Sequence, residues 1–365
     1  MIAAIASRPY VQAAVVAGYE VIAIDCFADK DTKRVAKAVH QVSLQNGQLD
    51  AGRVLEVISG IDSKDVAGFC YGAGFEMQAA VLDDIAKLLR VFGNAADVVK
   101  QCKDPNLFFQ YCDHLAVPYP SVLLQKPSLA EGWLQKKIGS SGGTHIKQVS
   151  AESEGDADIY FQKHQAGKSI SCLFFASANN VQVIGFNEQW LDGNSVLEPF
   201  RYGGAASQAE VSELAKTRLT DYVSKLANAI GLIGLNSCDA ICDGDEVFIL
   251  EINPRLSASI DLYISAHPDL IAKHVKASGE RLLEGGVSNG VDQTSTAHQV
   301  IYAKNDMTIA RGFSWPVWVA DIPEEGSDFK VGMPVCTVLG QESVAMQAKN
   351  LVQDRAVTLN KRFLN

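Results

Sequence analysis

Short apolar runs alternate with segments of helical spacing in the N-terminal part of the chain. The runs expected as strands cover residues 2–6, 21–25 and 66–71, and the segments expected as helices cover 11–17 and 76–89. Pro9 in the first turn and Gly18 after the last turn support the first helix. Alternating strands and helices predict a parallel, doubly wound sheet.

The hydrophobic pattern changes around Phe92-Gly93-Asn94, where we place the first domain boundary. Two short helices are expected at 95–102 and 106–115, and Pro118 and Pro120 follow them. From Val122 onward, short strands separated by glycine loops indicate antiparallel sheet. These strands are expected at 133–136, 146–149, 159–164, 169–176 and 181–186.

A long amphipathic helix is expected next, beginning at a capping box, Ser207-Gln208-Ala209-Glu210, and ending at Gly231. Its apolar face comprises Val211, Leu214, Leu219, Tyr222, Leu226 and Ile230. Two strands, 237–242 and 247–252, follow and are joined by a turn at Asp243-Gly244-Asp245. The remainder predicts short strands at 298–304 and 335–339 and a terminal helix.

Composition restricts the classes of function. The chain of 365 residues is 47% hydrophobic and 20% charged, which is typical of a globular protein with two or three subdomains. A net charge of -10 opposes binding to a phosphate backbone, so we expect no nucleic-acid partner. No apolar run approaches the roughly 20 residues that cross a bilayer, and the start lacks the basic flank of a signal peptide. We therefore expect a cytoplasmic protein without membrane contact.

The cysteines and paired glycines have ordinary explanations. The eight cysteines are scattered in apolar sequence, as buried thiols are, and Cys238 and Cys242 lack the second ligand pair of a zinc site. Gly72 and Gly74 follow a predicted strand, but Met77 stands where a dinucleotide fingerprint has its third glycine. A nicotinamide enzyme is therefore disfavoured.

The first segment that carries chemistry runs from Lys136 to Ile146. It consists of a lysine on a predicted strand, a loop that contains Ser141-Gly142-Gly143, and another strand. Glycines allow successive backbone N–H groups to surround anionic oxygens, and a lysine adds a compact positive charge. An ordinary hairpin loop explains a Gly/Ser stretch about as often.

The second such segment is Phe248 to Arg255. Alternation along a strand places Glu251 and Asn253 on one face, where their oxygens suit Mg²⁺. Asp239 on the neighbouring strand offers another carboxylate, and Arg255 is positioned to hold a phosphoryl group. The alternative is a solvent-facing pair beside an Asn-Pro turn.

In order and separation, these two segments resemble the ATP-grasp superfamily over residues 100–260, most specifically at Glu251-Ile252-Asn253-Pro254-Arg255. The resemblance implies a nucleotide clamped between two α+β lobes, with ATP and Mg²⁺, or alternatively Mn²⁺, as cofactors. We therefore predict an ATP-grasp fold with an N-terminal parallel-sheet domain and a small C-terminal α+β unit. The predicted parts are residues 1–98, the ATP-grasp domain 99–290 with lobes 99–163 and 164–290, and 291–365.

The resemblance also assigns roles to single residues. It implies nucleotide contacts from the glycine loop, two lysines and an interdomain hinge whose backbone reads adenine, and metal binding by three side chains. The nucleotide residues are Lys103, Lys136, Ser141, Gly142, Gly143, Gln162, Lys163, His164 and Ser169. The metal ligands are Asp239, Glu251 and Asn253, and the catalytic residues are Arg255 and Lys136.

Several positions depart from the family pattern. Lys137 replaces proline, and Ser140 and His145 replace glycines in the loop. Ser169 stands where many members have a ribose-binding glutamate, and Lys163 stands where an acidic hinge residue is common. Nucleotide selectivity is therefore open.

Within the superfamily, the chain looks like the branch that includes the tyramine–glutamate ligase of methanofuran biosynthesis. The segments that carry this likeness are 72–76, 187–189, 200–204 and 255–259. It implies a ligase that joins an amino acid such as glutamate to a small amine through an acyl phosphate, in cofactor biosynthesis. Gln189, Tyr202 and Ser257 are the candidate substrate residues, and a homodimer is compatible with the sequence.

Two other functions stay open. A nucleotide-binding regulatory protein would keep the fold without ligase activity. A biotin-dependent carboxylase component shares the superfamily, and its C-terminal unit resembles Gly332-Met333-Pro334-Val335-Cys336. His145 and His164 are expected to have structural or solvent-facing roles.

Overall fold

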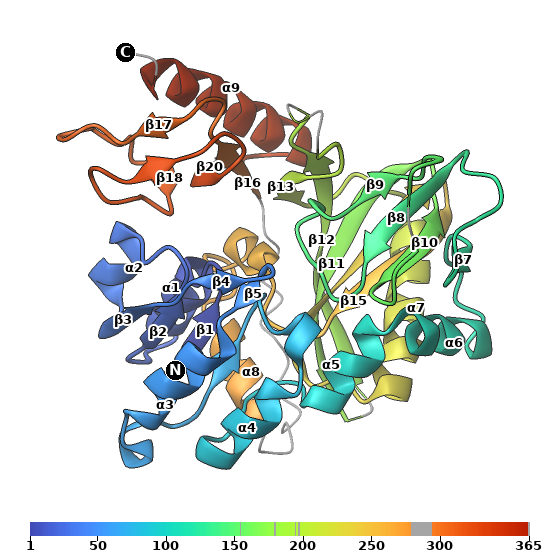
Figure 1. Ribbon diagram of the computed structural model, residues 1–365, viewed down its shortest axis with the longest axis horizontal. Coiled ribbons are helices and arrows are strands. Elements are labelled where there is room, and N and C mark those ends of the chain that lie inside the picture. The colour runs from blue at the N-terminus through green and yellow to red at the C-terminus, as the bar shows by residue number, and fades with distance from the viewer. Residues whose placement is uncertain (154, 179, 194, 196–197, 279–293, 364–365) are drawn as a thin grey trace.

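The computed structural model describes residues 1–365 except 154, 179, 194, 196–197, 279–293 and 364–365. Three bodies surround the middle of the molecule: an N-terminal α/β domain, a large sheet with a smaller lobe beside it, and a C-terminal segment (Figure 1). Within the described residues, no helix is long and apolar enough to cross a membrane.

The N-terminal domain contains a four-stranded sheet in the order β3-β2-β1-β6, and every pair of neighbours is parallel. Its strands are β1 (Ile2–Ala4), β2 (Ile22–Asp25), β3 (Ala38–Gln41) and β6 (Cys70–Tyr71). Its helices are α1 (Arg8–Val16), α2 (Lys30–Val35), α3 (Ala51–Ser59) and α4 (Val81–Leu88), with a hairpin of β4 (Leu44–Gln45) and β5 (Gln48–Leu49) and a 3-10 turn η1 (Ser63–Asp65). The predicted parallel sheet is confirmed.

The helix predicted over 76–89 is interrupted. A 3-10 turn, η2 (Glu76–Gln78), precedes α4. At the start of this turn, the Glu76 carboxylate turns back and accepts hydrogen bonds from the backbone N–H groups of Gly74 and Phe75. The pattern of apolar residues does not reveal this contact.

A small lobe follows the N-terminal domain. Two helices, α5 (Ala96–Lys103) and α6 (Pro105–His114), lead into an antiparallel sheet in the order β7-β10-β8-β9. Its strands are β7 (Val122–Leu123), β8 (Trp133–Lys137), β9 (Lys147–Gln148) and β10 (Ile159–Lys163). The glycine loop leaves the end of β8.

The large sheet has eight strands in the order β15-β14-β11-β12-β13-β16-β20-β18, all antiparallel to their neighbours. Its strands are β11 (Lys168–Ser177), β12 (Asn180–Leu191), β13 (Tyr202–Ser207), β14 (Gly234–Asp243), β15 (Glu246–Asn253), β16 (Ser295–Tyr302), β18 (Val319–Ala320) and β20 (Pro334–Glu342). A small ribbon of β17 (Met307–Thr308) and β19 (Asp328–Phe329) lies outside it.

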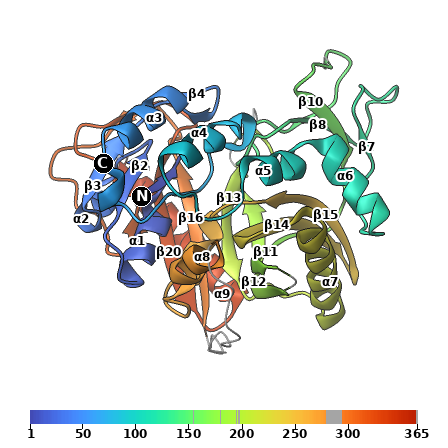
Figure 2. The ribbon, with the colours of Figure 1, turned by 90° about the horizontal axis from the view of Figure 1, so that it is seen from below.

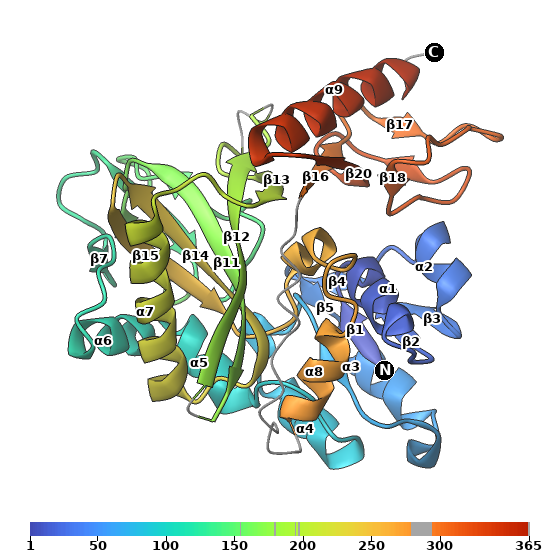
Figure 3. The same cartoon turned by 180° about the vertical axis from the view of Figure 1, so that it is seen from behind.

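Helices cover both faces of this sheet (Figures 2 and 3). α7 (Glu213–Ile230) packs on one face and α8 (Leu270–Ala277) on the other, while α9 (Ala345–Phe363) lies across β16 and β20. Alternation along β11 explains the arrangement, since Cys172 and Phe174 join the core under α7 and Leu173 joins the core shared with α8 and the N-terminal domain. The strand is therefore apolar on both sides.

The predicted capping box is wrong. Ser207 ends strand β13, and its hydroxyl accepts the backbone N–H of Thr296 on the neighbouring strand. The helix begins at Glu213, where Ser212 supplies the capping oxygen to the N–H of Ala215. Sheet pairing takes Ser207 out of the helix, and Leu214 of the predicted face is 49% exposed. Gly231 ends the helix in a left-handed conformation, as predicted.

The C-terminal strands continue the large sheet. β16 pairs with β13, and β20 pairs with β16, so segments distant in sequence share one sheet. The proposed domain limit between 98 and 99 falls inside α5, and the limit at 290 lies outside the described residues. All eight cysteines are free, and seven of them are buried.

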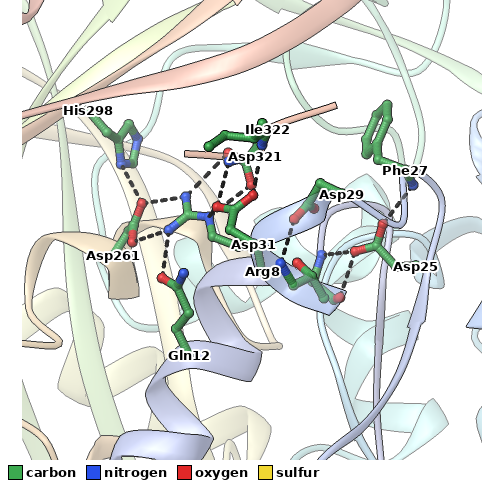
Figure 4. A network of polar contacts seen from close by, with 12 residues as sticks. Arg8, Gln12, Asp25, Phe27, Asp29, Asp31, Asp261, His298, Asp321 and Ile322 are labelled. Carbon is green, nitrogen blue, oxygen red and sulfur yellow. Dashed lines mark hydrogen bonds and ion pairs between the residues drawn. The ribbon is translucent and has the colours of Figure 1, made fainter. Parts of the chain in front are cut away.

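A buried polar cluster joins the N-terminal domain to later parts of the chain (Figure 4). The Arg8 guanidinium donates to Asp261 at 2.7 Å through two nitrogens and to Asp321 at 2.9 Å. Asp31 on α2 accepts the backbone N–H groups of Asp321 and Ile322. Asp261 lies in the 3-10 turn η3 (Ala258–Leu262). The cluster therefore links the N-terminal domain to two segments that are far from it in the sequence.

Candidate functional site

The candidate site begins on β14 and β15, whose register brings three polar side chains together. Asp239 pairs with Glu251, and Ser237 pairs with Asn253 two positions further along the two strands. The Asn253 amide donates to Asp239 at 3.0 Å, and Gln189 on β12 donates to the other Asp239 oxygen at 3.1 Å. The three predicted metal ligands therefore form one cluster.

Lys103 approaches this cluster from the end of α5. Its Nζ atom donates to Glu251 Oε2 at 2.9 Å and to Asn253 Oδ1 at 2.8 Å. The Lys103 side chain is only 5% exposed. Both contacts confirm that Glu251 and Asn253 lie on the same face of β15.

The two carboxylates differ in pKa. Burial favours the neutral form of Glu251, but Lys103 and Lys136 outweigh it and lower its pKa to about 2. Burial and the nearby Glu251 charge raise the pKa of Asp239 to about 6. At neutral pH both groups are anionic, and Asp239 is the one close to titration.

Lys136 is the second cation of the site. Its Nζ donates to Gln162 Oε1 on β10 at 2.9 Å and lies 5.8 Å from the centre of the Tyr160 ring. Burial lowers the pKa of Lys136, while Glu251 and Asp239 act in the opposite direction. The lysine thus faces the carboxylates without bonding to them directly.

Arg255 is held by a residue that sequence analysis did not assign to the site. Its Nε donates to Glu76 Oε1 at 2.8 Å, and its second terminal nitrogen lies 3.3 Å from Asn253 Oδ1. Although burial opposes ionisation, Arg255 and Lys103 lower the pKa of Glu76. Only the position of Glu76 after Gly74 in the sequence could have drawn attention to it.

The glycine loop closes over this site. Gly139, Gly142 and Gly143 have φ values of 68°, 74° and 77°, which favour glycine. The Gly142 carbonyl accepts the backbone N–H of Tyr202 at 3.0 Å, so the loop rests on the start of β13. The loop therefore bridges the small lobe and the large sheet.

A small cavity lies beneath the loop. Its volume is about 70 Å³, and Lys103, Lys136, His145, Tyr160 and Glu251 are among its lining residues. Burial lowers the pKa of His145 to about 4, so its imidazole is neutral. Because ligand sites typically measure roughly 300–1,000 Å³, the lobe must open before a nucleotide can enter.

The predicted hinge residues lie at the edge of the site. Gln162 is buried, whereas Lys163 and His164 are exposed. The backbone N–H groups of Lys163 and His164 donate to Ser121 and Gly132 within the small lobe. In this conformation these two N–H groups are already hydrogen-bonded within the chain, so the adenine of a nucleotide would have to bond to other groups of the hinge.

The remaining predicted residues are Ser169, Tyr202 and Ser257. Ser169 Oγ lies 3.4 Å from Gln189 Oε1, and Gln189 in turn donates to Asp239. The Tyr202 hydroxyl lies 2.7 Å from His298 Nε2. Ser257 Oγ accepts a hydrogen bond from Ser259. His298, which sequence analysis missed, lies 4.0 Å from Asp261 of the Arg8 cluster.

The donor atoms of the site suit a hard cation, which prefers oxygen ligands, better than a soft one. The described residues contain no group of three His, Cys, Asp or Glu side chains that could hold a metal. Asp239, Glu251 and Asn253 supply two carboxylates and an amide, a donor set suited to a cation that takes further oxygens from phosphate or water.

Comparisons with known proteins relate the chain to one family model over part of its length. Residues 102–259 match the family model described as the ATP-grasp domain. The carbamoyl phosphate synthase large chain of Thermus thermophilus is 24% identical over 274 residues, which cover 66% of this chain and 25% of that protein. The chain thus spans about a quarter of the length of this curated relative.

Two solved structures are similar over nearly the whole chain. An L-amino acid ligase from Bacillus licheniformis has a TM-score of 0.72 and 14% identity, covering 97% of this chain and 96% of that one. The biotin carboxylase domain of Hydrogenobacter thermophilus 2-oxoglutarate carboxylase, in complex with MgADP and bicarbonate, has a TM-score of 0.73 and 12% identity, covering 97% and 88%. The protein has the mixed α/β ATP-grasp fold.

Proposed function

We propose that this protein is an ATP-dependent ligase that activates a carboxylate as an acyl phosphate and transfers the acyl group to an amine. One observation carries the proposal. Asp239, Glu251 and Asn253 form an oxygen cluster that faces Lys103 and Lys136 beneath a glycine loop. Lys103, Lys136 and Glu251 line the same cavity, which supports a site where a cation and a phosphate bind side by side.

The oxygen cluster fits Mg²⁺, and Mn²⁺ suits the same donors. Asp239, Glu251 and Asn253 would hold the ion, which when bound neutralises negative charge on the nucleotide phosphates. Lys103 and Lys136 would supply positive charge to the phosphates of a bound nucleotide. Arg255, which is fixed by Glu76, has one terminal nitrogen 3.3 Å from Asn253 Oδ1 and is the proposed contact of the phosphoryl group. Catalysis then rests on positioning and charge neutralisation.

The glycine loop has a protective role in this proposal. It rests on Tyr202 through the Gly142 carbonyl and so covers the cavity. Exclusion of water would preserve an acyl phosphate until the amine attacks. We propose Gln189, which donates to Asp239, together with Tyr202 and Ser257 as substrate residues.

For the substrates, we propose an amino acid such as glutamate and a small amine, as in the assembly of a methanofuran-like cofactor. The similarity of the fold to an L-amino acid ligase supports an amino-acid carboxylate. The partners are therefore small molecules, and the net charge of -10 disfavours nucleic acid.

A screen for ADP release tests the proposal. Amino acids are crossed with small amines, including tyramine, and products are identified by mass; hydroxylamine added instead of the amine traps an acyl phosphate as a hydroxamate. We expect ADP and a hydroxamate with at least one amino acid, and neither with Glu251→Gln. Nucleotide binding without ADP in any pairing would overturn the ligase and favour a regulatory protein, and ADP release that requires bicarbonate would favour a carboxylase.

A further inference from the structure

Lys103 makes contacts that a phosphate-binding lysine does not need. Its ammonium lies between Glu251 Oε2, at 2.9 Å, and Asn253 Oδ1, at 2.8 Å. These are two of the three side chains that would hold the metal in the proposed function. The lysine therefore bonds to the ligand oxygens themselves.

The surroundings make these contacts strong. The Lys103 side chain is 5% exposed, so its charge is largely removed from water. Asn253 is fixed from its other end, because its amide donates to Asp239. A charge-assisted hydrogen bond in such a place holds both partners in defined positions. Lys103 thus keeps Glu251 and Asn253 oriented toward a single point.

A divalent ion and an ammonium cannot share that point. The two cations repel each other, and the metal can bind the Glu251 and Asn253 oxygens only if their hydrogen bonds to Lys103 are broken. Lys103 also cannot leave freely, since a buried ammonium without a partner is costly. It needs a new anionic partner within reach. The cavity beneath the glycine loop, lined by both Lys103 and Glu251, is where nucleotide phosphates would supply one.

We propose that Lys103 is a positioning residue that acts as an internal competitor of the metal, so that the ion binds tightly only when nucleotide phosphate draws Lys103 off Glu251 and Asn253. The inference rests on the proposed function, because it takes the same three ligands as the metal site. It adds an order of binding and a coupling between nucleotide and metal. By linkage, the metal must strengthen nucleotide binding by the same factor.

Lys136 offers a matched comparison. It is also a buried cation of the site, but it bonds to Gln162 rather than to the ligand oxygens. Its removal changes the electrostatic potential at Glu251 without freeing a ligand atom. Lys103→Met and Lys136→Met therefore separate competition for the oxygens from a general effect of charge.

Mn²⁺ binding, followed by electron paramagnetic resonance of the free ion, tests the proposal with no need for a substrate. Without nucleotide, we expect Lys103→Met to bind Mn²⁺ at least about tenfold more tightly than the wild-type protein, and Lys136→Met to gain at most about threefold. With the non-hydrolysable analogue AMP-PCP, the wild-type protein should gain more affinity for Mn²⁺ than Lys103→Met does. Lys103→Arg keeps the charge and should behave like the wild-type protein.

The outcomes are distinguishable. Equal Mn²⁺ affinity for Lys103→Met and the wild-type protein without nucleotide would overturn the competition, while leaving the proposed function intact. Unchanged Mn²⁺ binding in Glu251→Gln would refute the metal site and the proposal with it. Should Lys103→Met fail to fold, as circular dichroism would show, Lys103→Gln provides the neutral variant and the same expectation.

Discussion

Glu76 of the N-terminal domain and Arg255 at the end of β15 form a buried ion pair, with 2.8 Å between Oε1 and Nε. The two residues are separated by 179 positions in the sequence. The pair fixes the arginine beside Asn253 and joins the N-terminal domain to the candidate site. It is the contact by which one domain orients a proposed catalytic group of another.

Replacing Glu76 with glutamine should destabilise the protein strongly. The change leaves the Arg255 guanidinium buried without its counter-charge, and breaking a buried pair in this way costs about 3–5 kcal/mol. Urea unfolding measures the effect. Glu56→Gln serves as the control, because Glu56 pairs with Arg53 on an exposed helix face and should change stability by less than about 1 kcal/mol. Equal stability of Glu76→Gln and the wild-type protein would contradict the role given to the pair.

Gly143→Ala should displace the glycine loop. A Cβ atom at this position would meet the Phe200 carbonyl oxygen, and the φ of 77° already disfavours alanine. Gly142→Ala is the matched control, since its φ is 74° but its Cβ would meet nothing within 4 Å. We expect faster proteolysis within the loop and weaker nucleotide binding for Gly143→Ala than for Gly142→Ala. If the two variants are indistinguishable, close packing of the loop on β13 is not what holds it closed.

Metal binding should weaken in mild acid. The pKa of Asp239 is raised to about 6, and a ligand must be deprotonated to bind a cation. Protons therefore compete with the metal as the pH falls through about 6, whereas Glu251, with its pKa near 2, stays ionised. Mn²⁺ affinity in the presence of AMP-PCP should fall between pH 7.5 and 5 in the wild-type protein. Asp239→Asn should bind Mn²⁺ weakly and show a flatter pH profile, and an equally steep profile in that variant would exclude Asp239 as the titrating ligand.

Asp29→Asn should make stability less dependent on pH. Burial and the nearby acids Asp321 and Asp31 raise the pKa of Asp29 to about 8 from an ordinary value of 3.8. Between these two values the folded protein binds more protons than the unfolded chain, so Asp29 makes the protein less stable as the pH rises from about 4 to 8. Asparagine is always neutral and can still cap α2, where Asp29 accepts the Thr32 N–H.

Thermal or urea unfolding at pH 5 and pH 8 checks this expectation. The free energy of unfolding of Asp29→Asn, relative to that of the wild-type protein, should be at least about 1.4 kcal/mol higher at pH 8 than at pH 5. This difference is the equivalent of one pKa unit. Asp83→Asn, on the surface of α4, should show no such gain. A parallel decline of Asp29→Asn and the wild-type protein would show that other groups of the cluster titrate instead.

Local patterns in the sequence determined the parts of the site that depend on one or two strands. Alternation along β15 was enough to place Glu251 and Asn253 on one face, and the glycine loop was recognisable from its composition. The order of strands and helices likewise predicted the parallel sheet at the N-terminus. These features follow from the geometry of neighbouring residues, which the sequence contains directly.

Tertiary structure alone decided which distant residues meet. The Glu76–Arg255 pair, the contact of Tyr202 with His298 and the pairing of β16 with β13 join segments far apart in the chain. The same pairing took Ser207 out of the helix that its local pattern predicted. A side chain with several possible partners takes the one that burial and the fold bring within hydrogen-bond distance, and that choice depends on the whole chain. The position of Lys103 on the ligand oxygens has the same origin.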